Sequence, residues 1–226
     1  PRYLKLLELV KGEKTSDEVY EAVTEFGETT LGKGIVHAKD TPGFIGNRLI
    51  NANGRLVIEK ALEMGLSVED VDALTGTLIG NAKSAYFRTQ DIVGLDTALN
   101  VSNNMYERVT TESDEEREKF RPHDLLVKLV EDGRLGQKTG SGWYKKEGKE
   151  ILSLDLDTME YTPTKKTRFD TLRVGKPIKD LTTRLKAITF LDDKAAKFLW
   201  ECNVPLLIYT AEMIPEIADS IVEIDN

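Results

Sequence analysis

A run of apolar residues at helical spacing constrains the fold of this chain most. Apolar side chains recur at steps of three or four residues, on one face of a helix, at Ile45, Leu49, Ala52 and Leu56. Thr41-Pro42 precedes this run and Gly65 follows it. Proline is tolerated in the first turn of a helix, and glycine is common just past the last turn. The sequence therefore predicts a long amphipathic helix over residues 41–64.

The remaining patterns predict more helices and only short strands. The runs 3–10 and 35–39 have the length of strands. Helices are expected to begin near Ser16 and Ser67 and to cover 97–107, 123–131, 181–190 and 195–225. A glycine-rich stretch leads into a small β-hairpin near 143–161, and 163–180 is expected to be a connecting segment. The predicted fold is mostly α, with a short N-terminal strand and this hairpin.

Composition excludes several classes of protein. The 226 residues contain 31 Lys and Arg against 39 Asp and Glu, a formal net charge of -8, which repels nucleic acid. No apolar run approaches the roughly 20 residues of a membrane span. The single cysteine, Cys202, lies among apolar neighbours and cannot form an internal disulfide. We therefore expect a buried thiol and a cytoplasmic location, with neither nucleic acid nor membrane as a partner.

Motifs for metals and nucleotides are missing. His37, His123 and Cys202 lack the spacing of metal ligands, so no metal site is predicted. The stretch from Gly136 to Thr139 lacks the Gly-Lys pair of a P-loop, and no G-x-G-x-x-G follows a strand. A glycine-rich hairpin is favoured there over a phosphate site. No residue of this chain is predicted to bind a cofactor.

Two polar residues are candidates for chemistry. Glu8 is a carboxylate within an apolar strand, where it must find a hydrogen-bonding partner or become protonated. An ion pair with Lys5 or Arg48 would satisfy it. Asn47 falls early in the predicted long helix, where its amide can reach a ligand over the helix mouth. Spacing alone favours an ordinary polar surface residue at this position.

Four segments, in order, carry a family resemblance. They are the strand-like run at 1–10, the string K-D-T-P-G-F-I-G-N-R at 39–48, the D-x-V-G-L-D motif at 91–96 and G-Q-K-T-G-S-G-W-Y at 136–144. Together they resemble the C-terminal helical region of the NAD-dependent 3-hydroxyacyl-CoA dehydrogenases of fatty-acid β-oxidation. The remainder is similar to longer, repeat-containing members, some of which are fused to an enoyl-CoA hydratase. One departure is Ala85-Tyr86-Phe87-Arg88, where many members have Gly-Pro-Phe-Glu.

The resemblance implies roles for both candidates. Glu8 matches the Glu that orients the catalytic His of the family, and Asn47 matches an Asn beside the reacting oxygen. That His would lie upstream of Pro1, and so would the NAD-binding Rossmann domain, which is absent from this chain. The parent enzyme would oxidise (S)-3-hydroxyacyl-CoA to 3-oxoacyl-CoA with NAD, and it would form a homodimer through the helical domain. The fragment alone is expected to be inactive.

A weak internal repeat guides the predicted domain division. At an offset of 153 residues, four positions of 59–72 are identical in 212–225. We expect a junction with the missing domain at 1–40, the helical domain at 41–146, hairpin and linker at 147–180, and the start of a second, truncated helical repeat at 181–226. Two alternatives stay open: the helical domain of another 6-phosphogluconate-dehydrogenase-like oxidoreductase, and a non-catalytic helical dimerisation module.

Overall fold

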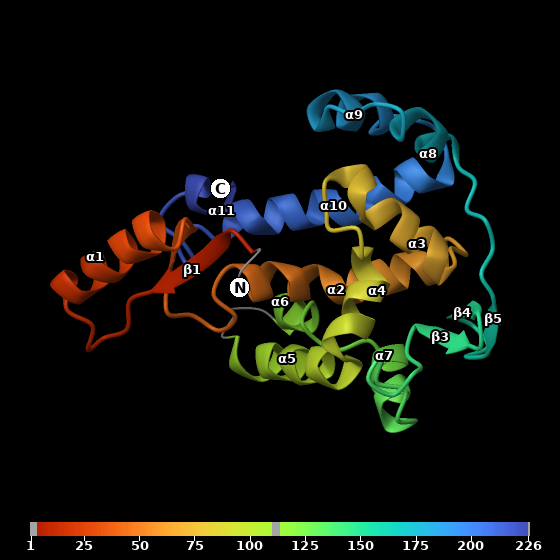
Figure 1. Ribbon diagram of the computed structural model, residues 1–226, viewed down its shortest axis with the longest axis horizontal. Coiled ribbons are helices and arrows are strands. Elements are labelled where there is room, and N and C mark those ends of the chain that lie inside the picture. The colour runs from red at the N-terminus through yellow and green to blue at the C-terminus, as the bar shows by residue number, and fades with distance from the viewer. Residues whose placement is uncertain (1–3, 110–113, 226) are drawn as a thin grey trace.

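The computed structural model describes residues 4–109 and 114–225, and its N-terminal part is a small α/β unit (Figure 1). Its two strands are parallel, with Glu8 opposite Val36. The Ser16 hydroxyl caps the helix between them by accepting a hydrogen bond from Val19 N. Both predicted strands and this helix are confirmed. In chain order the elements are β1 (Leu6–Val10), α1 (Asp17–Glu25), the π-helical turn η1 (Phe26–Thr30) and β2 (Gly34–Ala38).

The long helix α2 (Gly46–Glu63) begins later than predicted. Gly43 has a φ of 79° and Phe44 a φ of 49°, whereas an α-helix needs a φ near −63°. Phe44 N instead donates to Thr41 O in a turn. The expectation of a helix from residue 41 is therefore wrong: the Thr-Pro pair starts a set of turns that delivers the chain to Gly46.

Short helices follow α2, and the predicted start at Ser67 is confirmed. Ser67 Oγ accepts from Asp70 N, and the Asp70 carboxylate accepts from Ser67 N, which forms a capping box. These helices are α3 (Val68–Thr75), the 3-10 turn η2 (Thr77–Ile79), α4 (Ala85–Val93), α5 (Leu95–Arg108), α6 (Asp114–Glu118) and α7 (Asp124–Glu131).

The predicted hairpin is present and has a third strand. Strands β3 (Tyr144–Glu147) and β4 (Glu150–Leu154) are antiparallel, and β5 (Tyr161–Pro163) pairs with the other edge of β4. The run with Leu152 and Leu154 extends the sheet as expected, although Ser153 between them is buried as well. The chain is thus mostly helical with a small sheet, as predicted.

The basic segment 163–180 is not only a linker. It contains a short helix, α8 (Asp170–Gly175), before α9 (Leu181–Ile188). Asp193 holds this helix from a distance, because its carboxylate accepts hydrogen bonds from Thr171 N and Thr171 Oγ1. Such a contact has no signal in local periodicity, which explains why the sequence predicts only a connection there.

The last predicted helix is interrupted. Helix α10 (Lys194–Glu212) ends well before α11 (Ile221–Asp225), and turns at 213–217 separate them. Pro215 has no N–H to continue a helix, which accounts for the break. Helix α11 begins at Ile221, the position that the repeat pairs with Val68, the first residue of α3. Among the described helices, none combines the length and apolar character needed to cross a membrane.

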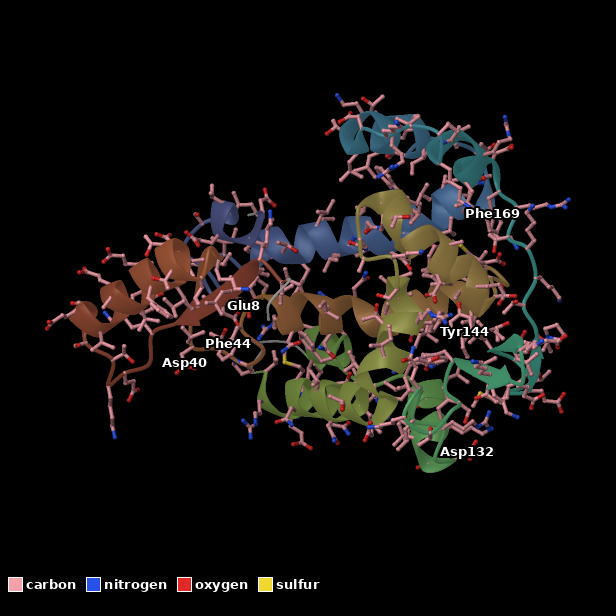
Figure 2. The ribbon with its side chains drawn as sticks, viewed as in Figure 1. Glu8, Asp40, Phe44, Asp132, Tyr144 and Phe169 are labelled. Carbon is pink, nitrogen blue, oxygen red and sulfur yellow. The ribbon has the colours of Figure 1, made fainter. Side chains whose placement is uncertain are left out.

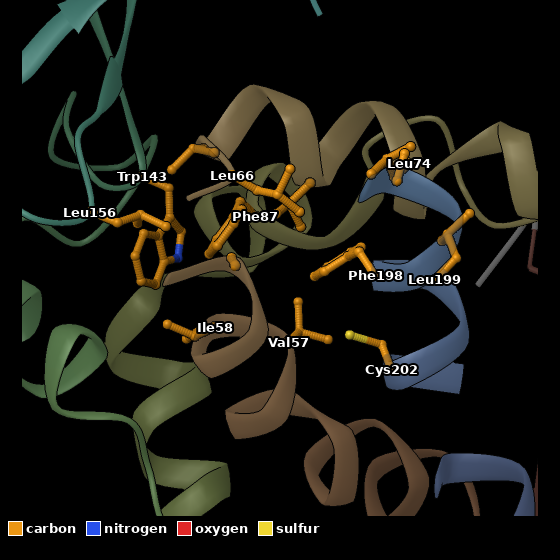
Figure 3. Close-up of a cluster of buried hydrophobic side chains, with 14 of the residues drawn as sticks. Val57, Ile58, Leu66, Leu74, Phe87, Trp143, Leu156, Phe198, Leu199 and Cys202 are labelled. Atoms are coloured by element: carbon orange, nitrogen blue, oxygen red, sulfur yellow. The ribbon is translucent and has the colours of Figure 1, made fainter. Parts of the chain in front are cut away.

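Helices α2 and α10 lie side by side and organise the core (Figure 1). Figure 3 shows Val57 and Ile58 of α2 with the α10 residues Phe198 and Cys202 on one side and Trp143 on the other. One continuous cluster of buried residues runs from Val57 on α2 to Cys202 on α10. Cys202 is a free and buried thiol, as expected. The last helices pack on the chain itself, and the proposed division at 146 and 180 stays a prediction.

Candidate functional site

Glu8 is held at the N-terminal end of α2. Its Oε1 accepts a hydrogen bond from Gly46 N at 2.5 Å, so the carboxylate lies at the positive end of the helix dipole. A Cβ on Gly46 would sit 3.2 Å from the same oxygen, which is why a residue without a side chain suits this contact. This hydrogen bond connects β1 to the start of α2, and β2 is connected separately to the C-terminal helices, where His37 N donates to the Glu223 carboxylate.

The turns before α2 make this contact possible. Gly43 packs so closely that a Cβ there would lie 2.6 Å from the sulfur of Met105 on α5. Its left-handed φ is also one that glycine adopts without strain. Figure 2 shows Phe44 next to Glu8, at the end of the molecule where the α/β unit meets α2. The T-P-G-F part of the string therefore positions the helix mouth.

Asn47 lies one residue beyond the amide that binds Glu8. Its side chain is exposed and makes no hydrogen bond with the residues the structure describes. Its backbone carbonyl accepts from the Asn51 side chain at 2.8 Å. The structure thus brings Glu8 and Asn47 to the same end of α2, as the family resemblance implies. Their chemical roles stay predictions.

The alternative ion pair for Glu8 is wrong. Within residues 4–109 and 114–225, no salt bridge joins Glu8 to Lys5 or Arg48. Arg48 points the other way and is fully buried. The second carboxylate oxygen of Glu8 has no hydrogen-bond partner in this part of the chain. That oxygen is open to a donor supplied from outside these residues.

Arg48 instead fastens the C-terminal helices to α2. Its Nε donates to the hydroxyl of Tyr209 at 2.6 Å, and one terminal nitrogen pairs with Glu216 at 3.0 Å. The guanidinium also lies over the ring of Phe120, 5.2 Å from its centre. Sequence reasoning considered Arg48 only as a partner for Glu8. Its true partners are more than 160 residues away, so spacing could not reveal them.

The two other family motifs, at 91–96 and 136–144, contact each other through Asp91. The Asp91 carboxylate accepts from Trp143 N and Tyr144 N, both at 2.9 Å. Gly136 and Gly142 permit this approach, because a Cβ on either would lie within 2.4 Å of an Asp91 oxygen. Figure 2 shows Tyr144 far from Glu8, at the other end of α2. These motifs build the fold and do not line the Glu8 end.

A second carboxylate, that of the partly buried Asp72, completes this structural cluster. It accepts from the backbone of Phe87 and Arg88 at the start of α4, and from the Tyr144 hydroxyl at 2.8 Å. Burial raises the pKa of Asp72 to about 6, and burial likewise raises the pKa of Asp91 to about 6. These shifts belong to a structural cluster, and no sequence motif indicated that Asp72 would join it.

Both histidines have structural contacts. His123 caps α7 by accepting from Leu125 N, and burial lowers the pKa of its imidazole. His37 Nδ1 lies 2.6 Å from the hydroxyl of Tyr20. Among the described residues, neither imidazole forms a hydrogen bond or salt bridge with Glu8.

A groove begins at Asn47 on the face of α2 turned away from α10. It has a volume of about 210 Å³ and is bounded by α2, α4, α5 and the segment 120–126. The α2 residues that line it include Ile50, Gly54 and Ile58, which recur at helical steps. Sequence reasoning assigned only the opposite face of this helix. The groove therefore runs along the helical region from the end of α2 that binds Glu8.

Residues 43–146 match the family model described as the C-terminal domain of 3-hydroxyacyl-CoA dehydrogenase. This match confirms the resemblance over residues 43–146.

Similar proteins are much longer than this chain. A probable 3-hydroxyacyl-CoA dehydrogenase of Bacillus subtilis is 42% identical over 225 residues, which is 100% of this chain and 28% of that protein. A putative fatty acid oxidation complex trifunctional enzyme of Rickettsia prowazekii is 27% identical over 100% of this chain and 30% of its own length. The solved (S)-3-hydroxybutyryl-CoA dehydrogenase PaaH1 of Ralstonia eutropha is 30% identical with a TM-score of 0.55, over 65% of this chain and 49% of that one.

Proposed function

We propose that this chain is the C-terminal portion of an NAD-dependent (S)-3-hydroxyacyl-CoA dehydrogenase of fatty-acid β-oxidation. The observation that carries the proposal is the Glu8 carboxylate, fixed beside Asn47 at the mouth of the family's first helix. The names of the similar proteins support the substrate class and the link to fatty-acid oxidation. The reaction proposed is oxidation of 3-hydroxyacyl-CoA to 3-oxoacyl-CoA.

Glu8 is proposed to position the base rather than to react. One oxygen is fixed by Gly46 N, and the other is free to accept a hydrogen bond from an imidazole N–H. A carboxylate in this position fixes the tautomer of the imidazole and favours its protonated form. The imidazole can then take the proton of the substrate 3-hydroxyl. The histidine itself is proposed to lie in the preceding domain.

Asn47 is proposed to bind the reacting oxygen. Its carboxamide has both a donor and an acceptor, and neither is used by the described residues. An amide N–H aimed at the oxygen stabilises the charge that develops as its proton leaves. Glu8 thus acts on the imidazole that accepts the proton, and Asn47 acts on the oxygen that loses it.

NAD is proposed to bind outside this chain. The connection from β1 to α1 contains a single glycine, Gly12. It therefore lacks the G-x-G-x-x-G turn that approaches a pyrophosphate. The residues present therefore do not fit a dinucleotide. Apolar side chains of the α/β unit, including Leu4, Val19 and Phe26, are exposed. Because exposed apolar side chains gathered on one unit are common at interfaces, these side chains support packing against a preceding domain.

The proposed activity has a direct test. The full-length protein should form NADH and 3-oxoacyl-CoA from NAD and (S)-3-hydroxyacyl-CoA, while residues 1–226 alone should show neither product. Absorbance of NADH, with the thioester product identified by mass spectrometry, measures both. Failure of the full-length protein to reduce NAD with this substrate would refute the proposal.

A homodimer through the helical region is also proposed. The outer face of α10 exposes Trp200, Leu207 and Ile208, the last two by more than half. Apolar residues gathered on one exposed helix face are common at protein interfaces. Light scattering on the purified chain should give twice 25.3 kDa. A monomer at high concentration would favour coverage of this face by another part of the same protein.

A further inference from the structure

The groove along α2 has a polar end and an otherwise apolar interior. On α2 its lining runs from Asn47 to Ile58, a rise of about 16 Å at 1.5 Å per residue. Its lining is predominantly apolar, as small-molecule sites usually are. Asn47, at the mouth, is where the proposed function puts the reacting oxygen. A ligand that enters here would place a polar head at Asn47 and an apolar tail along the helix.

Three of the polar side chains that line the groove, those of Asn51, Ser102 and Tyr86, already have partners. The Asn51 amide donates to Asn47 O and accepts from Ser102 Oγ at 2.9 Å. The Tyr86 hydroxyl donates to Gly54 O at 2.6 Å. Because these groups are satisfied internally, the wall offers little hydrogen bonding to a polar ligand such as a sugar or peptide. The carbon faces of these side chains are what the groove presents.

Apolar side chains also stand exposed at the rim. Ile50 is 67% exposed and Val93 is 54% exposed, and both line the groove. Covering a side chain of this size with an apolar ligand is favourable by roughly 25 cal/mol per Å² buried. Exposed apolar groups on both sides of an apolar channel therefore favour a hydrocarbon occupant.

The size of the groove fits a chain of moderate length. A dry apolar cavity of about 150 Å³ holds benzene, so about 210 Å³ has room for roughly eight carbon atoms. Tyr86 forms part of the wall at the position where many family members have proline. Its ring, tied to the α2 backbone through Gly54, narrows the space between α2 and α4.

We propose that this groove binds the acyl chain of the substrate, with the 3-hydroxyl end at Asn47 and the chain running along α2. The inference rests on the proposed function and deepens it, since it assigns preference for a medium acyl chain to the helical region. Val93 lies at the rim, so a bulky side chain at this position would block the groove.

Binding of acyl-CoA esters tests the proposal without turnover. Affinities of the full-length protein for butyryl-CoA and decanoyl-CoA are measured by calorimetry in wild type, Val93→Trp and Ile92→Trp. Ile92 is the matched control, because it is the neighbouring residue with nearly the same exposure, 55%, and it does not line the groove. Val93→Trp should lower the preference for decanoyl-CoA over butyryl-CoA by at least about tenfold, the effect of excluding two methylene groups. Ile92→Trp should leave the preference within about twofold of the wild-type value.

The outcomes distinguish failure of the acyl-chain assignment from failure of the proposed dehydrogenase reaction. An unchanged preference in Val93→Trp, or an equal change in Ile92→Trp, would overturn the acyl-chain assignment. If Val93→Trp does not fold, Val93→Asp gives the same test, because a carboxylate in the channel opposes a hydrocarbon. Dehydrogenase turnover is measured in parallel on wild type. Chain-length dependence that follows Val93 in a protein without turnover would keep the groove and reject the proposed reaction.

Discussion

Replacing Gly136 with alanine should destabilise the protein by about 4 kcal/mol, a large fraction of the 5–15 kcal/mol that holds a typical domain together. A Cβ at this position would lie 2.4 Å from the backbone oxygen of Asp91 and 2.7 Å from its Cα. Backbone atoms cannot rotate away as a flexible side chain can. The residue also has a φ of 92°, a left-handed conformation that alanine adopts only with strain.

Gly140 supplies the matched control for this substitution. It has a similar φ of 81°, but a Cβ there would meet nothing within 4 Å. Gly140→Ala should therefore cost only the conformational strain, about 1 kcal/mol. Urea unfolding of both variants measures the difference. Equal destabilisation would mean that the contact between the motifs at 91–96 and 136–144 does not determine stability.

Local patterns were sufficient where short-range contacts decide the structure. The capping box of Ser67 and Asp70 lies within one turn and starts α3 where predicted. The hairpin at β3 and β4 follows from the turn at Gly148 and the alternating leucines after it. The start of α2 was misplaced, because left-handed backbone at Gly43 and Phe44 overrides the usual helix signal of Thr-Pro.

Long-range contacts were beyond the reach of pattern reasoning. Arg48 finds Tyr209 and Glu216 across most of the chain. Helix α8 depends on Asp193, which belongs to the cap of α10. In each case the contact depends on how the helices pack. Local sequence patterns do not reveal that packing.

The candidate site was predictable only through the family motif. Spacing alone favoured an ordinary surface role for Asn47, and the structure does place its side chain in solvent at the helix mouth. The motif paired it with Glu8, and the contact between Glu8 and Gly46 brings both to one end of α2. The groove beyond Asn47 was missed because its lining comes from four helices and the loop before α7.

Glu8→Gln should lower the turnover number of the full-length enzyme by about 100-fold, the low end of effects on general acid–base catalysis. Glutamine keeps an oxygen for Gly46 N, so the helix contact survives and only the charge is lost. Loss of a charge at a helix end costs only about 0.3–1 kcal/mol of stability. Glu13→Gln is the matched control, because Glu13 is an exposed carboxylate on the loop after β1.

The pH dependence of turnover distinguishes a positioning role from a structural one. A carboxylate next to an imidazole raises its pKa, because it stabilises the imidazolium. Its removal should lower that pKa, and the acidic limb of the pH profile of kcat/KM should move to lower pH. A variant that is only partly unfolded would lose activity at every pH without this movement.

The pH profile of NADH formation by full-length Glu8→Gln, beside wild type and Glu13→Gln, is the most direct measurement. The carboxylate at the mouth of α2 predicts a loss of about 100-fold with the acidic limb displaced to lower pH, and a wild-type profile for Glu13→Gln. Wild-type turnover in Glu8→Gln, or a loss without displacement of the limb, would show that this carboxylate serves only to cap the helix.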